Sequence, residues 1–322
     1  MPVQSECGSR GDRMSTEMSV MVLGAGATGG YLAARLAKAG VPVTLIARGA
    51  NLRQIREHGI VLEDARAARE VVRPDRVLAV EEVDRPADLV LFCVKSYDTE
   101  TAARSVPPLV ASDGHVLCLQ NGVKNEQILA GKLGPSRILS GVLYIGADRL
   151  GPGVIRCSAP PKLIVGPYFG LDLGASSQVR ELFSRAGIEA AVEPEVSSSK
   201  WQKFLFNCGL NPLTAITGKR LGELLSYPAT AEVFDLLVAE AAAAARAAGA
   251  PLAPDHRVRV QHTAARMDIS SSMAEDLAAG RKIELEAFTG YVIELGAAHG
   301  VPTPVTRAAH GMLVALDSAT AS

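Results

Sequence analysis

The segment from Trp201 to Pro212 carries three polar side chains at a spacing that could do chemistry. Lys203, Asn207 and Asn211 recur every four positions in WQKFLFNCGLNP, so a helix would place them in one stripe on one face. The rest of the segment is mostly apolar, and a buried ammonium or amide needs a partner. A polar ligand is one such partner. Hydrogen bonds to neighbouring backbone are the alternative, and the spacing leaves both open.

A glycine-rich loop near the start of the chain is a second candidate. The apolar run Val20 to Leu23 leads directly into Gly24, Ala25, Gly26, Ala27, Thr28 and Gly29, and a helical pattern follows. In this context Gly24 makes the tight turn, Gly26 lets the backbone approach a pyrophosphate, and Gly29 lets the helix pack on the strand. Free N–H groups at the start of the helix favour the anion. The pattern predicts a dinucleotide site.

The end of the next apolar run indicates which dinucleotide binds. An NAD site carries an Asp or Glu about 20 residues beyond the first glycine, whereas the segment from Thr44 to Arg48 contains no acid. The guanidinium of Arg48 can bind a 2′-phosphate bidentately, so we expect NADPH as the cofactor. The alternative is an arginine that merely ends a strand in solvent.

Two further polar positions follow apolar runs. Lys95 comes after Leu89 to Val94, and Gln120-Asn121-Gly122 comes after Val116 to Leu119. Ligands of parallel α/β folds collect at the carboxyl ends of the strands. Lys95 is therefore a candidate for a phosphate or the ribose side of the cofactor, and Asn121 for the substrate or the nicotinamide ribose. A solvated lysine and an Asn-Gly turn are the alternatives.

The elements that must position these residues fall into two regimes. Short apolar runs alternate with amphipathic segments as far as about Glu193, which is the pattern of a parallel sheet with crossover helices. Beyond Val196 the strand signals vanish, and Ala, Leu and Glu dominate. We therefore expect an α/β, Rossmann-like N-terminal domain with a parallel sheet over 18–195 and an all-α C-terminal domain over 196–322, after a disordered leader over 1–17. The expected strands are Val20 to Leu23, Val43 to Ile46, Leu89 to Val94, Val116 to Leu119 and Arg137 to Leu143, and the expected helices include Tyr31 to Ala39, Glu100 to Ala111 and Phe234 to Ala248.

Composition narrows the class of protein. The 322 residues have a formal net charge of −1, so no basic surplus exists to neutralise nucleic acid. The longest apolar stretch contains Glu240 and Arg246, which argues against a membrane span. The five cysteines are scattered, which favours a reducing, cytoplasmic setting, and the histidines show no metal-ligand spacing. The Ala-rich helix suits either a packed core or a homodimer interface through the helical domain.

The ordered set of motifs resembles the ketopantoate reductases (2-dehydropantoate 2-reductases). The set comprises the loop from Gly24 to Gly29, Lys95, Gln120-Asn121-Gly122, the helix from Trp201 to Pro212, and Ser271-Ser272-Met273 with Glu284 twelve residues beyond Ser272. The resemblance runs from about Met18 to the C-terminal helix. It implies NADPH-dependent reduction of 2-dehydropantoate to (R)-pantoate, the step that feeds pantothenate and coenzyme A synthesis.

The resemblance also implies residue roles. Lys203 would be the general acid, Glu284 would assist at the cofactor and the catalytic lysine, Arg48 and Lys95 would serve NADPH, and Asn121, Asn207, Asn211 and Ser272 would contact the substrate. Two alternatives stay open. Ser272 begins a capping-box sequence that ends at Glu275, and Glu284 could be a surface carboxylate paired with Arg281 or Lys282.

The residue types also suit the implied reaction on physical grounds. When a hydride reaches a ketone carbon, negative charge grows on the oxygen, so a cationic donor there binds the transition state better than the ground state. With an ordinary pKa of about 10.4, Lys203 would be mostly protonated at neutral pH unless it is buried. A nearby Glu284 would favour the charged form.

One position departs from the family pattern. Some members carry a substrate-contacting Asn immediately before Gly-Glu-Leu, whereas Leu221 precedes Gly222-Glu223-Leu224 here. A reductase of another 2-keto acid or ketone is therefore the alternative function. A non-catalytic NADP-binding sensor is a rival from another class, and the presence of both Lys203 and Glu284 argues against it.

Overall fold

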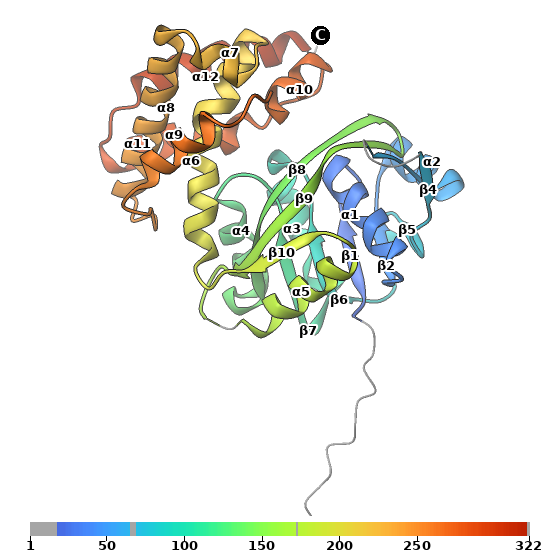
Figure 1. Cartoon of the computed structure of the whole chain (residues 1–322). Coiled ribbons are helices and arrows are strands. Elements are labelled where there is room, and N and C mark those ends of the chain that lie inside the picture. Colours follow the sequence, from blue (N-terminus) through green and yellow to red (C-terminus); the bar gives the residue numbers. More distant parts are fainter. Residues whose placement is uncertain (1–17, 65–68, 172, 321–322) are drawn as a thin grey trace, which may run out of the picture.

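The chain folds as a sheet followed by a bundle of helices (Figure 1). The structure is a computed structural model, and it describes residues 18–64, 69–171 and 173–320. The leader expected over 1–17 lies outside the described residues. Strands as far as Val192 form one ten-stranded sheet, and the described residues from Val196 onward contain the helices of the bundle.

The sheet is mixed and mostly parallel. Its strands are β1 (Val20–Leu23), β2 (Val43–Ile46), β3 (Ile60–Asp64), β4 (Glu70–Val72), β5 (Arg76–Leu78), β6 (Ala87–Phe92), β7 (Val110–Cys118), β8 (Ile138–Gly151), β9 (Val154–Pro167) and β10 (Glu189–Val192). They lie in the order β4-β3-β9-β8-β7-β6-β1-β2-β5, and β10 pairs with β9. The neighbours of β1 and β7 run parallel to them, whereas β8 with β9 and β3 with β4 are antiparallel. The parallel half is the expected Rossmann-like sheet.

The antiparallel half was only partly predicted. The expected strand from Arg137 to Leu143 is the first half of β8, which continues to Gly151 and pairs with the unpredicted β9. The outer part of this pair lacks a continuous apolar run, because one side of an antiparallel ribbon can face water. The two strands form the long arm that curves over α1 toward α2 in Figure 1.

The helix expected over Glu100 to Ala111 is wrong in its second half. Helix α3 (Thr99–Ser105) ends before two prolines, which form the short 3₁₀ turn η3 (Pro107–Leu109), and strand β7 begins at Val110. Proline lacks the N–H that a helix needs, and its ring clashes with the preceding turn of the helix. The two prolines therefore end the helix six residues early.

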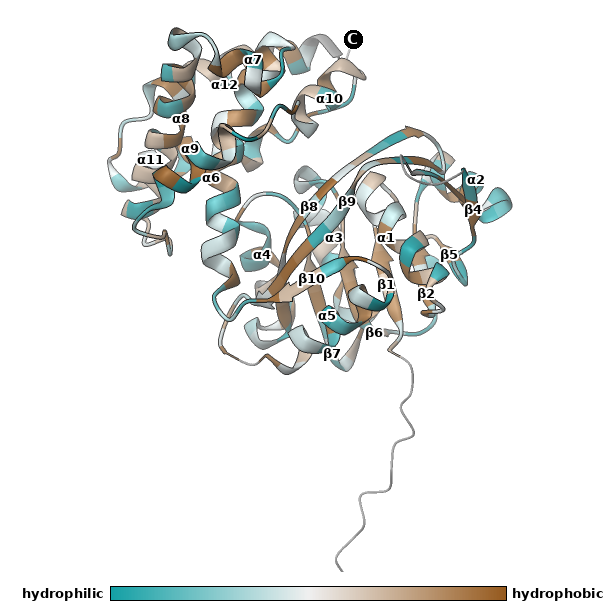
Figure 2. Cartoon of the chain, in the orientation of Figure 1, coloured by the Kyte–Doolittle hydropathy of each residue, from teal (hydrophilic) through white to brown (hydrophobic). Residues whose placement is uncertain are grey.

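The helices divide between the two parts of the chain. Around the sheet lie α1 (Ala27–Lys38), α2 (Gly49–His58), α3, α4 (Asn125–Leu133) and α5 (Gly174–Arg185), and the bundle contains α6 (Val196–Thr217), α7 (Leu221–Leu225), α8 (Pro228–Ala247), α9 (His256–Ala264), α10 (Ser272–Ala278), α11 (Thr289–His299) and α12 (Pro304–Thr320). Two apolar clusters cover the faces of the sheet, with Leu91 in one and Phe92 in the other, and a third surrounds Phe204 in the bundle. Figure 2 shows the apolar strands inside and polar residues on the outer helix faces. Among the described helices, none has the length and apolar character that crossing a lipid bilayer requires.

Helix α6 is the axis of the bundle. Its Gly209 lets α8 come close, since a Cβ at this position would lie 2.6 Å from the ring of Phe234. The Ala-rich helix α8 buries Ala241 and Ala245, so it occupies the core of the helical part, one of its two expected roles. Between the two parts, β10 ends at Val192 and α6 begins at Val196. We keep 18–195 and 196–322 as the proposed domain bounds.

The turn between β1 and α1 is built on its glycines. Gly24 has a φ of +110°, which side chains rarely allow, and a Cβ on Gly29 would collide with the carbonyl oxygen of Gly24. Gly26, the N-cap of α1, faces open space instead, with no atom of the described chain within 4 Å of a Cβ built on it. The turn itself therefore requires glycine at positions 24 and 29. Packing does not explain the glycine at position 26, where the backbone is not covered by other atoms.

We expect Gly29→Ala to lower the free energy of unfolding by about 1–3 kcal/mol, because the added methyl must push α1 away from the turn. Equilibrium unfolding in urea measures the effect. The matched control is Gly131→Ala in α4, where nothing lies within 4 Å of the added methyl. That variant should be at least as stable as the native chain. Equal stability of the two variants would contradict the packing role of Gly29.

Candidate active site

The carboxyl ends of four parallel strands meet at one edge of the sheet. β1 ends at the glycine turn, β2 is followed by Ala47 and Arg48, β6 by Cys93, Val94 and Lys95, and β7 by the segment Leu119 to Asn121. Helix α1 has no acidic residue in its first turn, so no carboxylate of that turn competes for its free N–H groups. This edge gathers the predicted dinucleotide residues at the place where such folds bind ligands.

Arg48 is the N-cap residue of α2 and lies largely in solvent, with 87% of its side chain exposed. It donates a hydrogen bond to Asp98 across 2.6 Å. The guanidinium therefore has a carboxylate partner at the sheet edge, next to the β6 turn. Asp98 follows Lys95 in the 3₁₀ turn η2 (Ser96–Asp98), so the ends of β2 and β6 are tied together. Sequence inspection missed Asp98.

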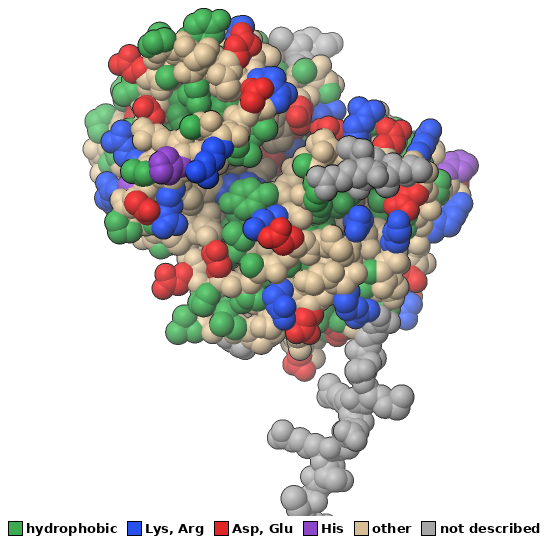
Figure 3. Space-filling model, viewed as in Figure 1, with side chains coloured by type: hydrophobic (Ala, Val, Ile, Leu, Met, Phe, Trp, Pro, Cys, Tyr) green, Lys and Arg blue, Asp and Glu red, His purple; other side chains and the backbone are tan. Residues whose placement is uncertain are grey.

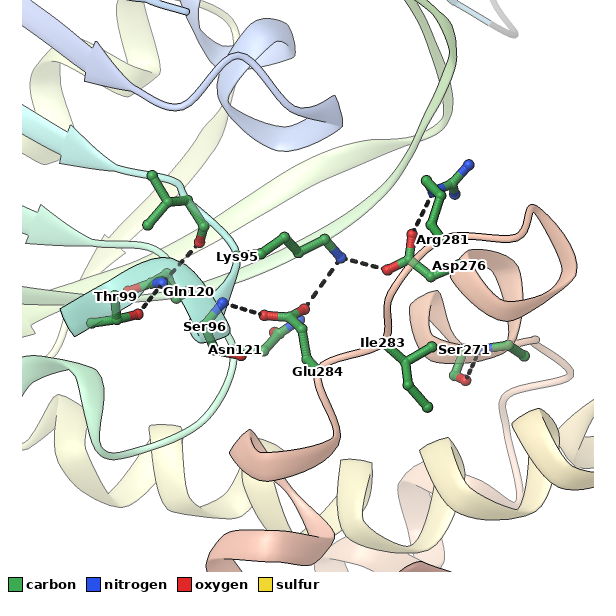
Figure 4. Close-up of polar contacts among 12 residues, drawn as sticks. Lys95, Ser96, Thr99, Gln120, Asn121, Ser271, Asp276, Arg281, Ile283 and Glu284 are labelled. Carbon is green, nitrogen blue, oxygen red and sulfur yellow. Dashed lines mark hydrogen bonds and ion pairs between the residues drawn. The ribbon is translucent and has the colours of Figure 1, made fainter. Parts of the chain in front are cut away.

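An ion network joins the sheet edge to the helical part (Figure 4). The ammonium of Lys95 lies 2.6 Å from Asp276 of α10 and 3.2 Å from Glu284, and the N–H of Ser96 donates to Glu284 across 2.8 Å. Burial disfavours the charged form of Lys95, but the carboxylates of Glu284 and Asp276 outweigh it and raise the pKa of Lys95. The network links two regions about 180 residues apart in the sequence.

The surface alternative for Glu284 is wrong. Its side chain is 9% exposed and faces Lys95, while Arg281 pairs with Asp276 across 2.8 Å. The ammonium of Lys282 lies 4.7 Å above the ring of Tyr97. Glu284 precedes the 3₁₀ turn η5 (Leu285–Ala287), which packs near η2 and holds the carboxylate against the sheet edge. Nothing in the sequence alone distinguishes Asp276 from the other acidic residues.

A pocket opens between the sheet edge and α6. It is lined by Gln120, Asn121, Gly122, Gly141, Val142, Lys200, Lys203, Phe204 and Asn207. The surface is hollowed between the two parts of the chain in Figure 3. The structure therefore brings Asn121 together with Lys203 and Asn207 of the predicted stripe. Asn211 lies one turn further along α6, is 2% exposed, and is not among the lining residues.

Lys203 is half-buried in the wall of this pocket. Its ammonium donates to the carbonyl oxygen of Leu143 across 2.5 Å and lies 5.3 Å from the centre of the Tyr144 ring. Burial and the neighbouring charge of Lys200 lower the pKa of Lys203 to about 7, against the opposing pull of Glu284. An amine with this pKa exchanges its proton readily at neutral pH, which suits a general acid.

Hydrogen bonds hold the loop that carries Asn121. The amide of Gln120 donates to the Val94 carbonyl and to the Thr99 hydroxyl, each across 2.8 Å. The hydroxyl of Thr99 donates to Asn125 across 3.0 Å, and the Asn125 amide donates to the Asn121 carbonyl across 2.9 Å. Gln120 therefore joins the ends of β6 and β7, and Asn121 sits on a braced turn.

Ser272 does not cap α10, contrary to one expectation. The cap is Ser271, whose hydroxyl accepts the N–H of Ala274 across 3.1 Å and receives the hydroxyl of Thr214 across 2.6 Å. With three serines in succession, Ser270 to Ser272, the capping pattern was displaced by one residue. Ser272 is the first residue of α10 and is exposed. Leu221 is fully buried at the start of α7, so it serves packing at its position.

Sequence inspection also missed a buried ion pair beside the pocket. The ammonium of Lys200 contacts the carboxylate of Glu126, and their side chains are 4% and 0% exposed. Lys200 lies three positions before Lys203 on the same helix, so extending the stripe by one turn would have found it. Among the described residues, no group of three or more His, Cys, Asp or Glu side chains is placed to hold a metal ion.

Comparison with known proteins gives matches along most of the chain. Residues 20–170 match the family model described as "Ketopantoate reductase PanE/ApbA", and residues 195–317 match "Ketopantoate reductase PanE/ApbA C terminal". The two matched segments lie either side of the junction between β10 and α6. They contain every predicted site residue named above.

Individual proteins of known sequence or structure also match most of the chain. A 2-dehydropantoate 2-reductase of Halobacterium salinarum is 34% identical over 293 residues, which cover 90% of this chain and 96% of that protein. One of Caulobacter vibrioides is 33% identical over 308 residues, which cover 94% and 99%. The crystal structure of a PanE/ApbA family ketopantoate reductase from Ralstonia eutropha JMP134 has a TM-score of 0.85 and 33% identity, over 95% of this chain and 100% of that one.

We expect Lys203 to titrate with a midpoint near its pKa of about 7. Only the neutral amine reacts with acetic anhydride, so labelling of Lys203 should rise as the pH passes through 7 and level off above it. Mass spectrometry of the Lys203 peptide, labelled over a range of pH, measures the midpoint. A short lysine-containing peptide serves as the control, with a midpoint near the ordinary value of about 10.4. A Lys203 midpoint at that ordinary value would contradict the burial effect.

Proposed function

The chain belongs to the ketopantoate reductase family, and from that premise we propose that it reduces 2-dehydropantoate to (R)-pantoate with NADPH. The observation that carries the proposal is the pocket in which Lys203 of α6 meets the carboxyl edge of the sheet. The pocket brings a proton donor next to the sheet edge that is proposed to bind the dinucleotide. Both are needed for a ketone to become an alcohol.

Lys203 is the proposed general acid. NADPH, when bound, supplies the hydride that the keto carbon receives. As charge grows on the keto oxygen, the ammonium of Lys203 stabilises it and then gives up a proton to form the hydroxyl. A pKa of about 7 matches the donor to neutral pH, because a lysine with its ordinary pKa would hold its proton too strongly. The Leu143 carbonyl accepts one N–H of the ammonium and so fixes its direction.

The sheet edge is the proposed cofactor site, and its residues fit the dinucleotide. The open space over Gly26 leaves room for the pyrophosphate beside Gly24, Ala25, Ala27, Thr28 and Gly29. Arg48 is proposed for the 2′-phosphate. Lys95, Asn121 and Glu284 are proposed for the ribose side, where Glu284 is already held by the Ser96 N–H.

The amide and hydroxyl side chains are the proposed substrate contacts. Asn121 and Asn207 line the pocket, and their amides can donate to a carboxylate or hydroxyl. Asn211 and Ser272 carry this role by resemblance alone. Leu221 stands where some family members have a substrate-contacting Asn, and its burial favours a difference in substrate recognition at this point. Another 2-keto acid is therefore the second candidate substrate.

Setting and assembly also belong to the proposal. We infer a cytoplasmic enzyme whose partners are the cofactor and a small keto acid. A homodimer through the helical part is supported by exposed apolar side chains on α12, where Met312 is 49% and Val314 46% exposed.

The function is tested by NADPH oxidation, followed by absorbance, with 2-dehydropantoate beside a panel of other 2-keto acids. The highest kcat/KM should be found with 2-dehydropantoate. A higher kcat/KM with another keto acid would mean that this acid is the substrate instead. Tight NADPH binding without oxidation of the cofactor by any keto acid would mean that the chain is a sensor.

Lys203→Met should lower kcat by about a hundredfold or more and leave the dissociation constant of NADPH nearly unchanged, because the general acid acts in the transition state. Steady-state kinetics and a fluorescence titration of NADPH measure the two quantities. Lys219→Met is the control, since Lys219 is exposed and paired with Glu223 after the same helix. Unchanged kcat in Lys203→Met would remove this lysine from the reaction.

Arg48→Asp should weaken NADPH binding by about tenfold or more and move the preference toward NADH, because a carboxylate repels the 2′-phosphate that a guanidinium binds. The ratio of kcat/KM for NADPH to that for NADH measures the preference. Arg257→Asp, the same change of charge at an exposed position of α9, is the control. If both variants keep the native ratio, Arg48 does not read the phosphate.

A further inference from the structure

Two lysines line one pocket in this chain, and only one of them is paired with a carboxylate. Lys200 and Lys203 are both on α6, three positions apart, so their side chains leave the helix on the same face. The ammonium of Lys200 contacts Glu126, whereas that of Lys203 bonds the Leu143 carbonyl. The proposed reaction uses Lys203 and leaves Lys200 without a role.

The Lys200–Glu126 pair is anchored from three elements. Glu126 lies in the first turn of α4, where a carboxylate is favoured by the helix dipole, and it accepts the hydroxyl of Ser140 from β8 across 2.6 Å. The same oxygen takes the contact with Lys200 of α6. The second carboxylate oxygen is buried and has no hydrogen-bond partner within the described chain. A charge pair placed this deep is costly to build, and apolar side chains of similar size would often be as stable.

The charged and titratable groups around Lys203 come from three directions. Lys200 lies on its own helix, Tyr144 faces it from β8, and Glu284 acts on it from the segment before η5. Tyr144 is neutral at neutral pH, since burial and Glu193 raise its pKa above the ordinary value. The charges that act on Lys203 are therefore the cation of Lys200, whose own partner is Glu126 of α4, and the carboxylate of Glu284.

We propose that Lys200, anchored by Glu126, is a positioning residue for the reduction, because its buried positive charge acts on Lys203 across one turn of α6 and makes Lys203 the lysine that releases its proton. The inference rests on the proposed function. The two lysines differ in their partners. Lys200 stays protonated because it is paired with the carboxylate of Glu126, whereas Lys203, bonded to a carbonyl, can release its proton.

The pKa directions agree with this geometry. Burial opposes the charged form of Lys200, but Cys118 and Glu126 outweigh it and raise its pKa. For Lys203, burial acts first and the charge of Lys200 second, and both lower the pKa. When the pKa values of two groups in one pocket are shifted in opposite directions, the shifts indicate which group acts as the acid and which one supports it.

The test compares variants at Lys200 by the labelling midpoint of Lys203 and by the alkaline limb of the pH profile of kcat. Lys200→Met should move both to higher pH by about one unit, since it removes one unit charge at short range. Lys200→Arg keeps the charge and should restore the native midpoint. Lys219→Met, an exposed ion-paired lysine, is the control and should leave both unchanged.

A double variant guards against misfolding, because Lys200→Met alone strands the buried carboxylate of Glu126. Lys200→Met with Glu126→Gln removes both charges and should give an upward shift as well, smaller than that of Lys200→Met alone because a nearby negative charge is removed too. A native midpoint in either folded variant would overturn the inference, as would a rise in KM with an unmoved alkaline limb, which would make Lys200 a substrate ligand. The labelling midpoint needs no turnover, so its shift in Lys200→Met would stand even if no keto acid were reduced, and only the proposed function would then fail.

Discussion

The hydrogen bond between the ammonium of Lys203 and the Leu143 carbonyl is the contact on which the site depends. It joins the axis of the helical part to β8 of the sheet, so the donor and the dinucleotide edge are held in one pocket. Burial and the charge of Lys200 lower the pKa of Lys203 to about 7, and its hydrogen-bond partner is a neutral carbonyl instead of a carboxylate. A carboxylate in the same position would hold the proton and weaken the lysine as an acid.

The chain supplies carboxylates to two other lysines instead. Lys95 is bound by Asp276 and Glu284 at the sheet edge, and Lys200 is bound by Glu126 in the wall of the pocket. Both lysines keep their charge as a result, whereas Lys203 titrates. The same contacts tie the two parts of the chain together, since Asp276 and Glu284 come from the helical part and Glu126 from the sheet part. The same few side chains therefore fix the charges of these lysines and hold the two parts of the chain together.

Local patterns predicted the central parallel strands β1, β2, β6 and β7 and the stripe on α6, because each depends on residues close in sequence. β1 and β2 have their expected bounds, and Lys203, Asn207 and Asn121 meet in one pocket. Features that depend on distant partners were not predictable in this way. Asp276 and Glu126 become significant only when folding brings each to a lysine more than 70 residues away. The β8–β9 arm was hidden by its mixed, half-exposed pattern, and the cap at Ser271 by the serines on both sides of it.

The most direct test of the account is a crystal structure of the protein with NADP⁺ and 2-dehydropantoate, which cannot react together. The account predicts that the ammonium of Lys203 lies within about 3 Å of the keto oxygen, with the keto carbon facing the nicotinamide held at the carboxyl edge of the sheet. A keto acid bound away from Lys203, with that ammonium still on the Leu143 carbonyl and the nicotinamide outside the pocket, would contradict it.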